Sequence, residues 1–249
     1  MVRPMIFNGR VLAVLASTLF ALPGGTEPWD KSPEQWDLAD SYKILRDSPW
    51  TPSEMKVEAN FTQRHTDKLT GLMIDSPTNA TDTPVIRGVE VNRNKPLPAL
   101  SILWWSSRTV RLAERRLLEL KNSRNAPQPR QIETLPDYVI AIEGSEPMRI
   151  FQGAKEDLHE TVFLVLDEGL TLDLAEVKFV EATEDTEARV EFHFPREVGG
   201  HPAIDPQSEK IEFHCRASAK TPRPGRQNAL SIRSQFHPRA MRANGAPDL

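Results

Sequence analysis

Two pairs of glutamate and histidine residues are the first candidates for chemistry in this chain of 249 residues. Glu191 and His193 form one pair, and Glu212 and His214 form the other. A phenylalanine separates the two members of each pair, and a β-strand places residues two apart on the same face. Each pair therefore presents a carboxylate beside an imidazole. Zinc and non-haem iron are bound by such ligands.

The pairing of the strands decides whether these four side chains can meet. If the strands expected near 187–194 and 209–216 form an antiparallel hairpin, both pairs lie in one patch and could hold zinc or iron in a metal-assisted hydrolase. Otherwise they lie on a solvated sheet face, where a Glu–His pair contributes a fraction of a kcal/mol. The sequence favours the solvated face, and a protein without a cofactor, over the metal site.

Other catalytic motifs are absent from the sequence. It contains no Gly-x-Ser-x-Gly nucleophile motif, no phosphate-binding glycine loop and no dinucleotide-binding fingerprint. Cys215 alternates with Ile211 and Phe213, which predicts an inward-facing thiol that packs as a small apolar group. No catalytic residue is therefore predicted.

The elements that must position these residues are mostly strands. Met55, Val57 and Ala59 alternate with polar residues, which indicates a half-buried strand. Two helices are expected, one from Ser32 to about Asp47 and one over 107–120. Further strands are expected at 85–91, 97–105, 138–142, 161–166, 177–182, 187–194, 209–216 and 229–236. The order of elements predicts a β-rich α+β fold of mostly antiparallel sheets, sandwich-like, with two main helices.

The first 25 residues have the layout of a secretory signal peptide. Arg3 and Arg10 precede a run of twelve residues, 11–22, of which ten are apolar, and Pro23-Gly24-Gly25 follows. The run is too short to span a membrane, which takes about 20 apolar residues. The mature chain, 26–249, is expected to be one secreted or periplasmic domain with an α/β part (30–147) and a β part (158–249).

Composition limits the partners of this domain. The first 25 residues hold two of the 31 basic residues and none of the 35 acidic ones, so the remainder has a net charge of −6. An acidic balance argues against nucleic-acid binding. The single cysteine cannot form an internal disulfide, and no cysteine follows the apolar run as a lipid anchor would require. No integral membrane span is expected after cleavage.

Several short motifs resemble an uncharacterised family of secreted bacterial proteins. In that family a helix directly after the signal peptide ends in Ser-Pro-Trp, as at Ser48-Pro49-Trp50 here. The likeness continues through Phe192-His193-Phe194-Pro195-Arg196, Lys210–Phe213 and Phe236…Asp248-Leu249. The helix from Trp36 to Ile44 is also faintly similar to GWxTD-domain proteins. Neither resemblance implies an activity or site residues.

Three classes of function remain open. The first is a non-catalytic binding module of the cell envelope, whose partner is an envelope or extracellular protein or a glycan that could stack on Trp29, Trp36 and Trp50. The second is the metal-assisted hydrolase. The third is a structural component that assembles through an exposed sheet edge. The missing motifs favour the binding or structural classes.

Overall fold

A computed structural model describes residues 27–66, 73–80, 85–86, 100–121, 132–220 and 227–249. The helices are α1 (Leu38–Arg46), α2 (Arg108–Lys121), α3 (Ser145–Gly153) and α4 (Leu158–Thr161). The strands are β1 (Glu54–Thr66), β2 (Met73–Ala80), β3 (Val85–Ile86), β4 (Ser101–Trp104), β5 (Asp137–Glu143), β6 (Val162–Val165), β7 (Thr171–Asp173), β8 (Glu176–Val180), β9 (Arg189–Pro195), β10 (Glu197–Val198), β11 (His201–Pro202), β12 (Ile211–Lys220), β13 (Gln227–Phe236), β14 (Arg242–Ala243) and β15 (Ala246–Pro247).

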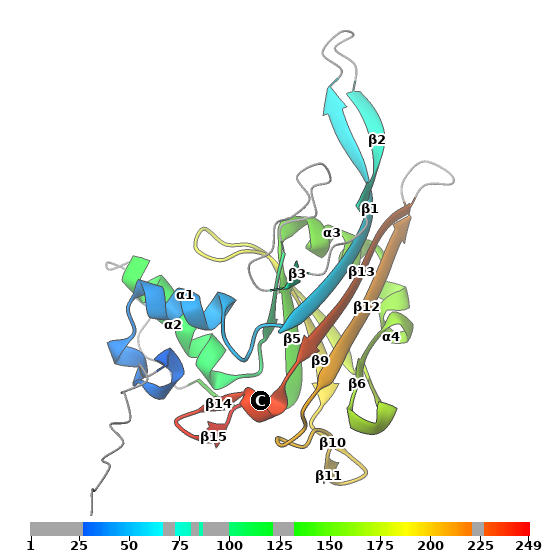
Figure 1. The fold of residues 1–249 in the computed structure, drawn as a ribbon. Coiled ribbons are helices and arrows are strands. Elements are labelled where there is room, and N and C mark those ends of the chain that lie inside the picture. The colour runs from blue at the N-terminus through cyan, green and yellow to red at the C-terminus, as the bar shows by residue number, and fades with distance from the viewer. Residues whose placement is uncertain (1–26, 67–72, 81–84, 87–99, 122–131, 221–226) are drawn as a thin grey trace, which may run out of the picture.

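Two antiparallel sheets form the body of the protein (Figure 1). The larger sheet has the order β2-β1-β13-β12-β6-β7, with β3 also paired to β1, and the smaller sheet has the order β4-β5-β9-β8. Each sheet combines strands from the early and the late parts of the chain, since β1 pairs with β13 and β5 pairs with β9. The β-rich α+β class predicted from the sequence is confirmed.

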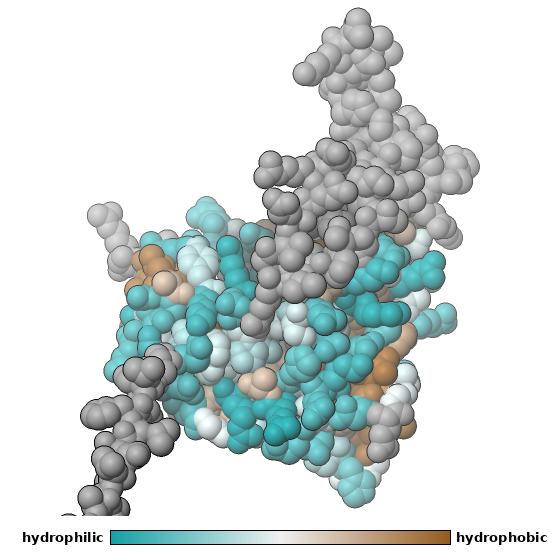
Figure 2. Space-filling view, in the orientation of Figure 1, coloured by the Kyte–Doolittle hydropathy of each residue, from teal (hydrophilic) through white to brown (hydrophobic). Residues whose placement is uncertain are grey.

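Phenylalanine side chains join the two sheets. The ring centroid of Phe213 in β12 lies 5.6 Å from that of Phe192 and 6.4 Å from that of Phe194, both in β9, and all three side chains are fully buried. The prediction from the sequence alternation that these phenylalanines face the core is therefore confirmed. The opposite face of the larger sheet is mostly hydrophilic, as the described part of Figure 2 shows.

The first helix begins later than the sequence predicted. Pro33–Gln35 forms a single 3₁₀ turn in which the Ser32 side chain makes no capping hydrogen bond, and α1 starts only at Leu38. Trp36 has extended backbone angles and donates from Nε1 to the Pro28 carbonyl at 2.6 Å. Asp37 is the true cap, because its carboxylate accepts from the backbone N–H of Asp40. The predicted end near Asp47 is correct.

Of the other helices, the sequence predicted α2 but not α3 or α4. Helix α2 agrees with the prediction, and Val110, Ala113 and Leu117 are its buried residues, together with Thr109. Helices α3 and α4 were not defined by the pattern; Pro147 lies in the first turn of α3, where proline is tolerated. Helix α3 packs against both sheets and approaches β12 closely, since a Cβ on Gly153 would lie 2.7 Å from Cβ of Ala219. No helix in the described ranges is long and apolar enough to cross a membrane.

The last two residues of the chain connect three distant segments, and we call this set of contacts the terminal clamp. The Asp248 carboxylate accepts hydrogen bonds from the Ser107 hydroxyl and from the backbone N–H groups of Arg108 and Thr109, at 2.8 to 2.9 Å, and so caps α2. Trp50 donates from Nε1 to the Asp248 carbonyl at 2.7 Å, and Arg196 donates to the Leu249 carbonyl at 2.8 Å. Trp50, Arg196 and Asp248, which are far apart in the sequence, thus meet at one place.

Candidate functional site

The two predicted Glu–His pairs lie on different sheets. Glu191 and His193 are on the outer face of β9 and are buried, whereas Glu212 and His214 are on the solvent side of β12. Strand β9 pairs with β5 and β8, and β12 pairs with β13 and β6, so the hairpin on which a shared patch depended is not formed. The expectation that the four side chains could lie in one patch is therefore wrong.

The pair on β12 is a surface interaction. His214 Nε2 lies 3.1 Å from the Glu212 carboxylate, and the imidazole stacks on the Phe163 ring with centroids 5.0 Å apart. Hydrogen bonds from Lys210 and His214 lower the pKa of Glu212. Within the described ranges no three His, Cys, Asp or Glu side chains are arranged to hold a metal ion. This pair matches the solvated-face interpretation of the sequence.

The pair on β9 belongs to a chain of charged groups beneath α2. Glu114 of α2 accepts from Arg189 at 3.3 Å, and Arg189 donates from Nε to Glu191 at 2.7 Å. The other Glu191 oxygen lies 3.6 Å from Nε2 of His193, whose Nδ1 is 3.2 Å from the Asp137 carboxylate. Arg189 also stacks on the Trp105 ring at 4.1 Å. The chain links the helix layer to the smaller sheet.

Burial and pairing move the two glutamate pKa values in opposite directions. For Glu191, burial raises the pKa, but the nearby His193 imidazole and the hydrogen bond and charge of Arg189 outweigh it, so the net pKa is lowered. For Glu114, burial dominates and raises the pKa; Arg189 opposes this change, while Glu143 and Glu191 add to it. Glu114 therefore holds a proton more readily than an exposed glutamate does.

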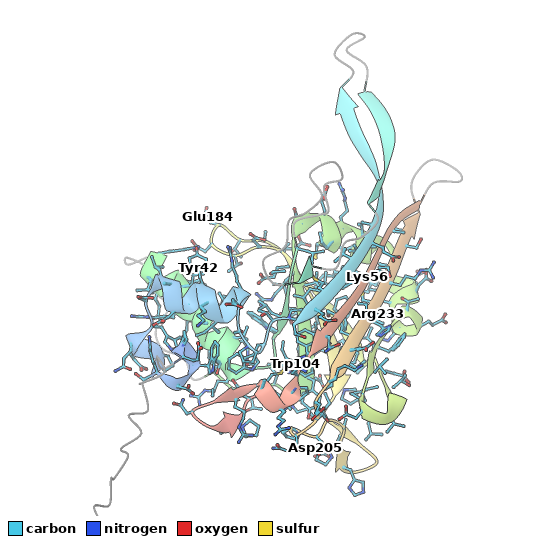
Figure 3. All side chains as sticks on the ribbon, in the orientation of Figure 1. Tyr42, Lys56, Trp104, Glu184, Asp205 and Arg233 are labelled. Carbon is cyan, nitrogen blue, oxygen red and sulfur yellow. The ribbon has the colours of Figure 1, made fainter. Side chains whose placement is uncertain are left out.

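A pocket of about 560 Å³ opens next to Glu114, between the helix pair α1–α2 and the edge of the smaller sheet. Figure 3 shows Tyr42 of α1 on one side of this region and the loop that carries Glu184 above it. Its size is typical of small-molecule sites. The lining residues are Tyr42, Leu45, Arg46, Thr51, Pro52, Met55, Leu100, Ser101, Ile102, Glu114, Leu117, Leu118, Lys121, Glu143, Asp185, Thr186 and Glu187.

Four carboxylates (Glu114, Glu143, Asp185 and Glu187), two cations (Arg46 and Lys121) and several apolar side chains line the pocket. We call the part around Glu114 and Glu143 the acidic end and the part around Arg46 and Lys121 the basic end. At the acidic end Glu143, the last residue of β5, accepts from the Ser101 hydroxyl at 2.6 Å and lies near Glu114. At the basic end Arg46 and Lys121 both lie over the Tyr42 ring, 5.0 and 5.4 Å from its centroid. Leucine, isoleucine and methionine side chains lie among the remaining lining residues. Such a pocket can bind an amphipathic ligand.

Comparison of the chain with protein-family models, with curated proteins and with solved structures found no match.

The tryptophans around α1 are packing residues. Trp50 and Trp36 are 0% and 2% exposed, which leaves no stacking shelf formed by all three rings. Trp29 packs edge-on against Trp50 at 5.7 Å between centroids, and Trp36 packs with Ile44 and Ala113 between α1 and α2. The ordinary packing interpretation applies to Trp36 and Trp50.

The single thiol is expected to be inert in the native state. Cys215 is 2% exposed, and burial raises the pKa of its thiol well above the usual range, which removes the reactive thiolate at neutral pH. With a thiol-reactive chromogenic disulfide at pH 8, we expect reaction at about the rate of unfolding in native buffer and a rapid reaction in 6 M guanidinium chloride. Fast native labelling would contradict the inward orientation.

The sequence did not reveal the pocket. Glu114, Leu118 and Lys121 lie on the flank of α2, beside the apolar stripe that marks the helix, and Glu143 ends a strand. The i, i+4 and i+7 spacing along α2 was a usable signal, because it places an acid, an apolar group and a base on one helix face. Nothing local to the sequence indicates that Glu143 lies opposite them.

Proposed function

We propose that this chain is an exported, non-catalytic binding protein of the bacterial cell envelope and that the pocket beside α2 is its binding site. The pocket is the observation that carries the proposal: it combines apolar walls with charged groups at both ends. The export signal and the acidic mature composition are consistent with a secreted or periplasmic location and with a ligand other than nucleic acid.

The hydrolase alternative is less well supported. It requires His193, His214, Glu191 and Glu212 around one vacant metal position. His193 instead lies between two carboxylates beneath α2, and His214 faces solvent on the other sheet. Among the residues that the structure describes, no second histidine lies beside His193 as a metal ligand, so neither pair supplies the ligand set of a hydrolytic zinc site.

The assembly alternative is also less well supported by the sheet edges that are described. Strand β8, at the edge of the smaller sheet, exposes Glu176 and Lys178, which form an ion pair at 3.0 Å. Strand β7, at the edge of the larger sheet, is three residues long and ends in the exposed Asp173. Charges and short strands oppose pairing between sheet edges.

The proposal is tested by filling the pocket. Leu118→Trp adds an indole to the pocket from the partly exposed flank of α2. The mature protein is incubated with the small-molecule extract of an envelope fraction, desalted, and weighed by native mass spectrometry. We expect a ligand of a few hundred daltons on the wild type and at least about a ten-fold lower occupancy in the variant.

Leu170→Trp is the matched control, because Leu170 is 63% exposed and is not a pocket residue. It should keep the full ligand occupancy, and the unfolding midpoints of both variants should lie near that of the wild type. Equal occupancy in Leu118→Trp and the wild type, or no bound species in any form, would count against the pocket as a binding site.

A further inference from the structure

We infer that the ligand of this pocket is a zwitterionic amphiphile, with an ammonium or guanidinium group at one end of an apolar chain and an anionic group at the other. The inference rests on the proposed binding function and specifies the chemical class of the ligand. Three observations carry it: an excess of carboxylates at one end of the pocket, two cationic side chains at the other end, and the spacing between them along α2.

The acidic end holds more negative than positive charge. Glu114, Glu143 and the adjacent Glu191 are three carboxylates, and Arg189 is the cation that pairs with two of them, Glu114 and Glu191. Glu143 forms no ion pair with any residue that the structure describes, and its partner is the neutral hydroxyl of Ser101. Carboxylates in a partly buried, apolar setting are stabilised by a nearby cation. A ligand ammonium group would supply that charge.

The basic end lies about two helical turns away. Glu114 and Lys121 are seven residues apart on α2, which corresponds to roughly 10 Å along the helix axis at 1.5 Å per residue. Lys121 and Arg46 converge on the ring of Tyr42, so two cations are held near one point of the pocket lining. An anionic group at this end of the ligand would gain an attractive interaction with both.

Along α2, the lining between the two ends is apolar. Leu117 and Leu118 lie between Glu114 and Lys121 on the same helix, and Leu45, Met55 and Ile102 also line the pocket. Burying the methylene groups of a ligand there stabilises the complex. An aliphatic chain whose extended length is near 10 Å therefore matches the separation of the charged ends.

The test measures the affinity of four probes by isothermal titration calorimetry at pH 8. The probes are 8-aminooctanoate, octylamine, octanol and octanoate, which share chain length and differ in their end groups. We expect octylamine to bind about ten-fold more tightly than octanol, because a hydrogen bond to a charged group contributes roughly 1.5 kcal/mol or more. 8-Aminooctanoate should bind about three-fold more tightly again, since the basic end is solvent-exposed.

Matched variants assign each end group to its site. Glu143→Gln keeps an acceptor for Ser101 but removes the charge, and it should lower the affinity for octylamine about five-fold or more without changing that for octanol. Lys121→Gln should remove only the advantage of 8-aminooctanoate over octylamine. Glu119→Gln is the control, because Glu119 pairs with Arg115 and Arg116 on the same helix and does not line the pocket.

The pH dependence of binding gives an independent measurement. The groups acting on Glu114 are Arg189, which lowers its pKa, and Glu143 and Glu191, which raise it along with burial. A cation favours the ionised carboxylate, so octylamine binding should release protons and its affinity should fall as the pH is lowered through the raised pKa of Glu114. Octanol affinity should not change over the same range.

The outcomes separate the ligand class from the binding function. If octanol binds as tightly as octylamine, or if Glu143→Gln has no effect, the ligand class is wrong; the pocket still binds if Leu118→Trp abolishes octanol binding. If no probe binds while the envelope extract supplies a ligand, the zwitterionic class is again overturned. If neither a probe nor an extract ligand binds, the proposed function itself fails.

Discussion

Replacing Phe213 by alanine is expected to lower the free energy of unfolding by about 4 kcal/mol, because truncating a buried phenylalanine removes apolar contacts and leaves a cavity. The Phe213 side chain is 0% exposed and packs between Phe192 and Phe194 of the opposite sheet. For a domain of this size the melting temperature should fall by roughly 8 to 16 °C. Urea denaturation followed by circular dichroism measures the change.

Phe163→Ala is the matched control for this experiment. Phe163 is also a phenylalanine in the larger sheet, paired in register with His214, but it is only partly buried and stacks on that imidazole. Its loss should cost at most about 1 kcal/mol. A similar decrease in the free energy of unfolding for the two variants would show that Phe213 is not packed between the two sheets.

Removing the Asp248 carboxylate is expected to destabilise the protein by about 2 kcal/mol, although the residue is the second-last in the chain. In Asp248→Ala, helix α2 loses a cap that accepts three hydrogen bonds and a negative charge at its N-terminus. The Ser107 hydroxyl and the Thr109 N–H then lose their partner in a buried setting. The melting temperature should fall by roughly 4 to 8 °C.

Two further variants test why Asp248→Ala is expected to be less stable. Asp248→Asn keeps an oxygen acceptor and loses the charge, so about half of the destabilisation is expected. Asp157→Ala is the control, because Asp157 precedes α4 but its side chain makes no capping hydrogen bond, and its loss should change stability by no more than about 0.5 kcal/mol. A neutral result for Asp248→Ala would mean that the terminal clamp does not stabilise α2.

Sequence periodicity predicted the elements that are amphipathic on their own. The alternation in β9, β12 and β13 identified their buried faces, and the apolar stripe of α2 identified its inner side, because such patterns reflect burial of one face. The start of α1 was wrong because a side-chain contact, Trp36 to the Pro28 carbonyl, competes with the capping pattern at Ser32. Helix α3 was missed because Pro147 interrupts a short segment.

The alternation of residues in the chain determined that Glu191 and His193 share a face, and likewise Glu212 and His214, because side-chain direction along a strand depends only on the backbone. Only the tertiary structure decided which strands are neighbours: β9 and β12 entered different sheets, so the two pairs lie apart. The same holds for the pocket, where Glu143 lies near Glu114, and Tyr42 near Lys121, from segments distant in the chain. Contacts of this kind depend on how the layers pack, which local sequence patterns do not specify.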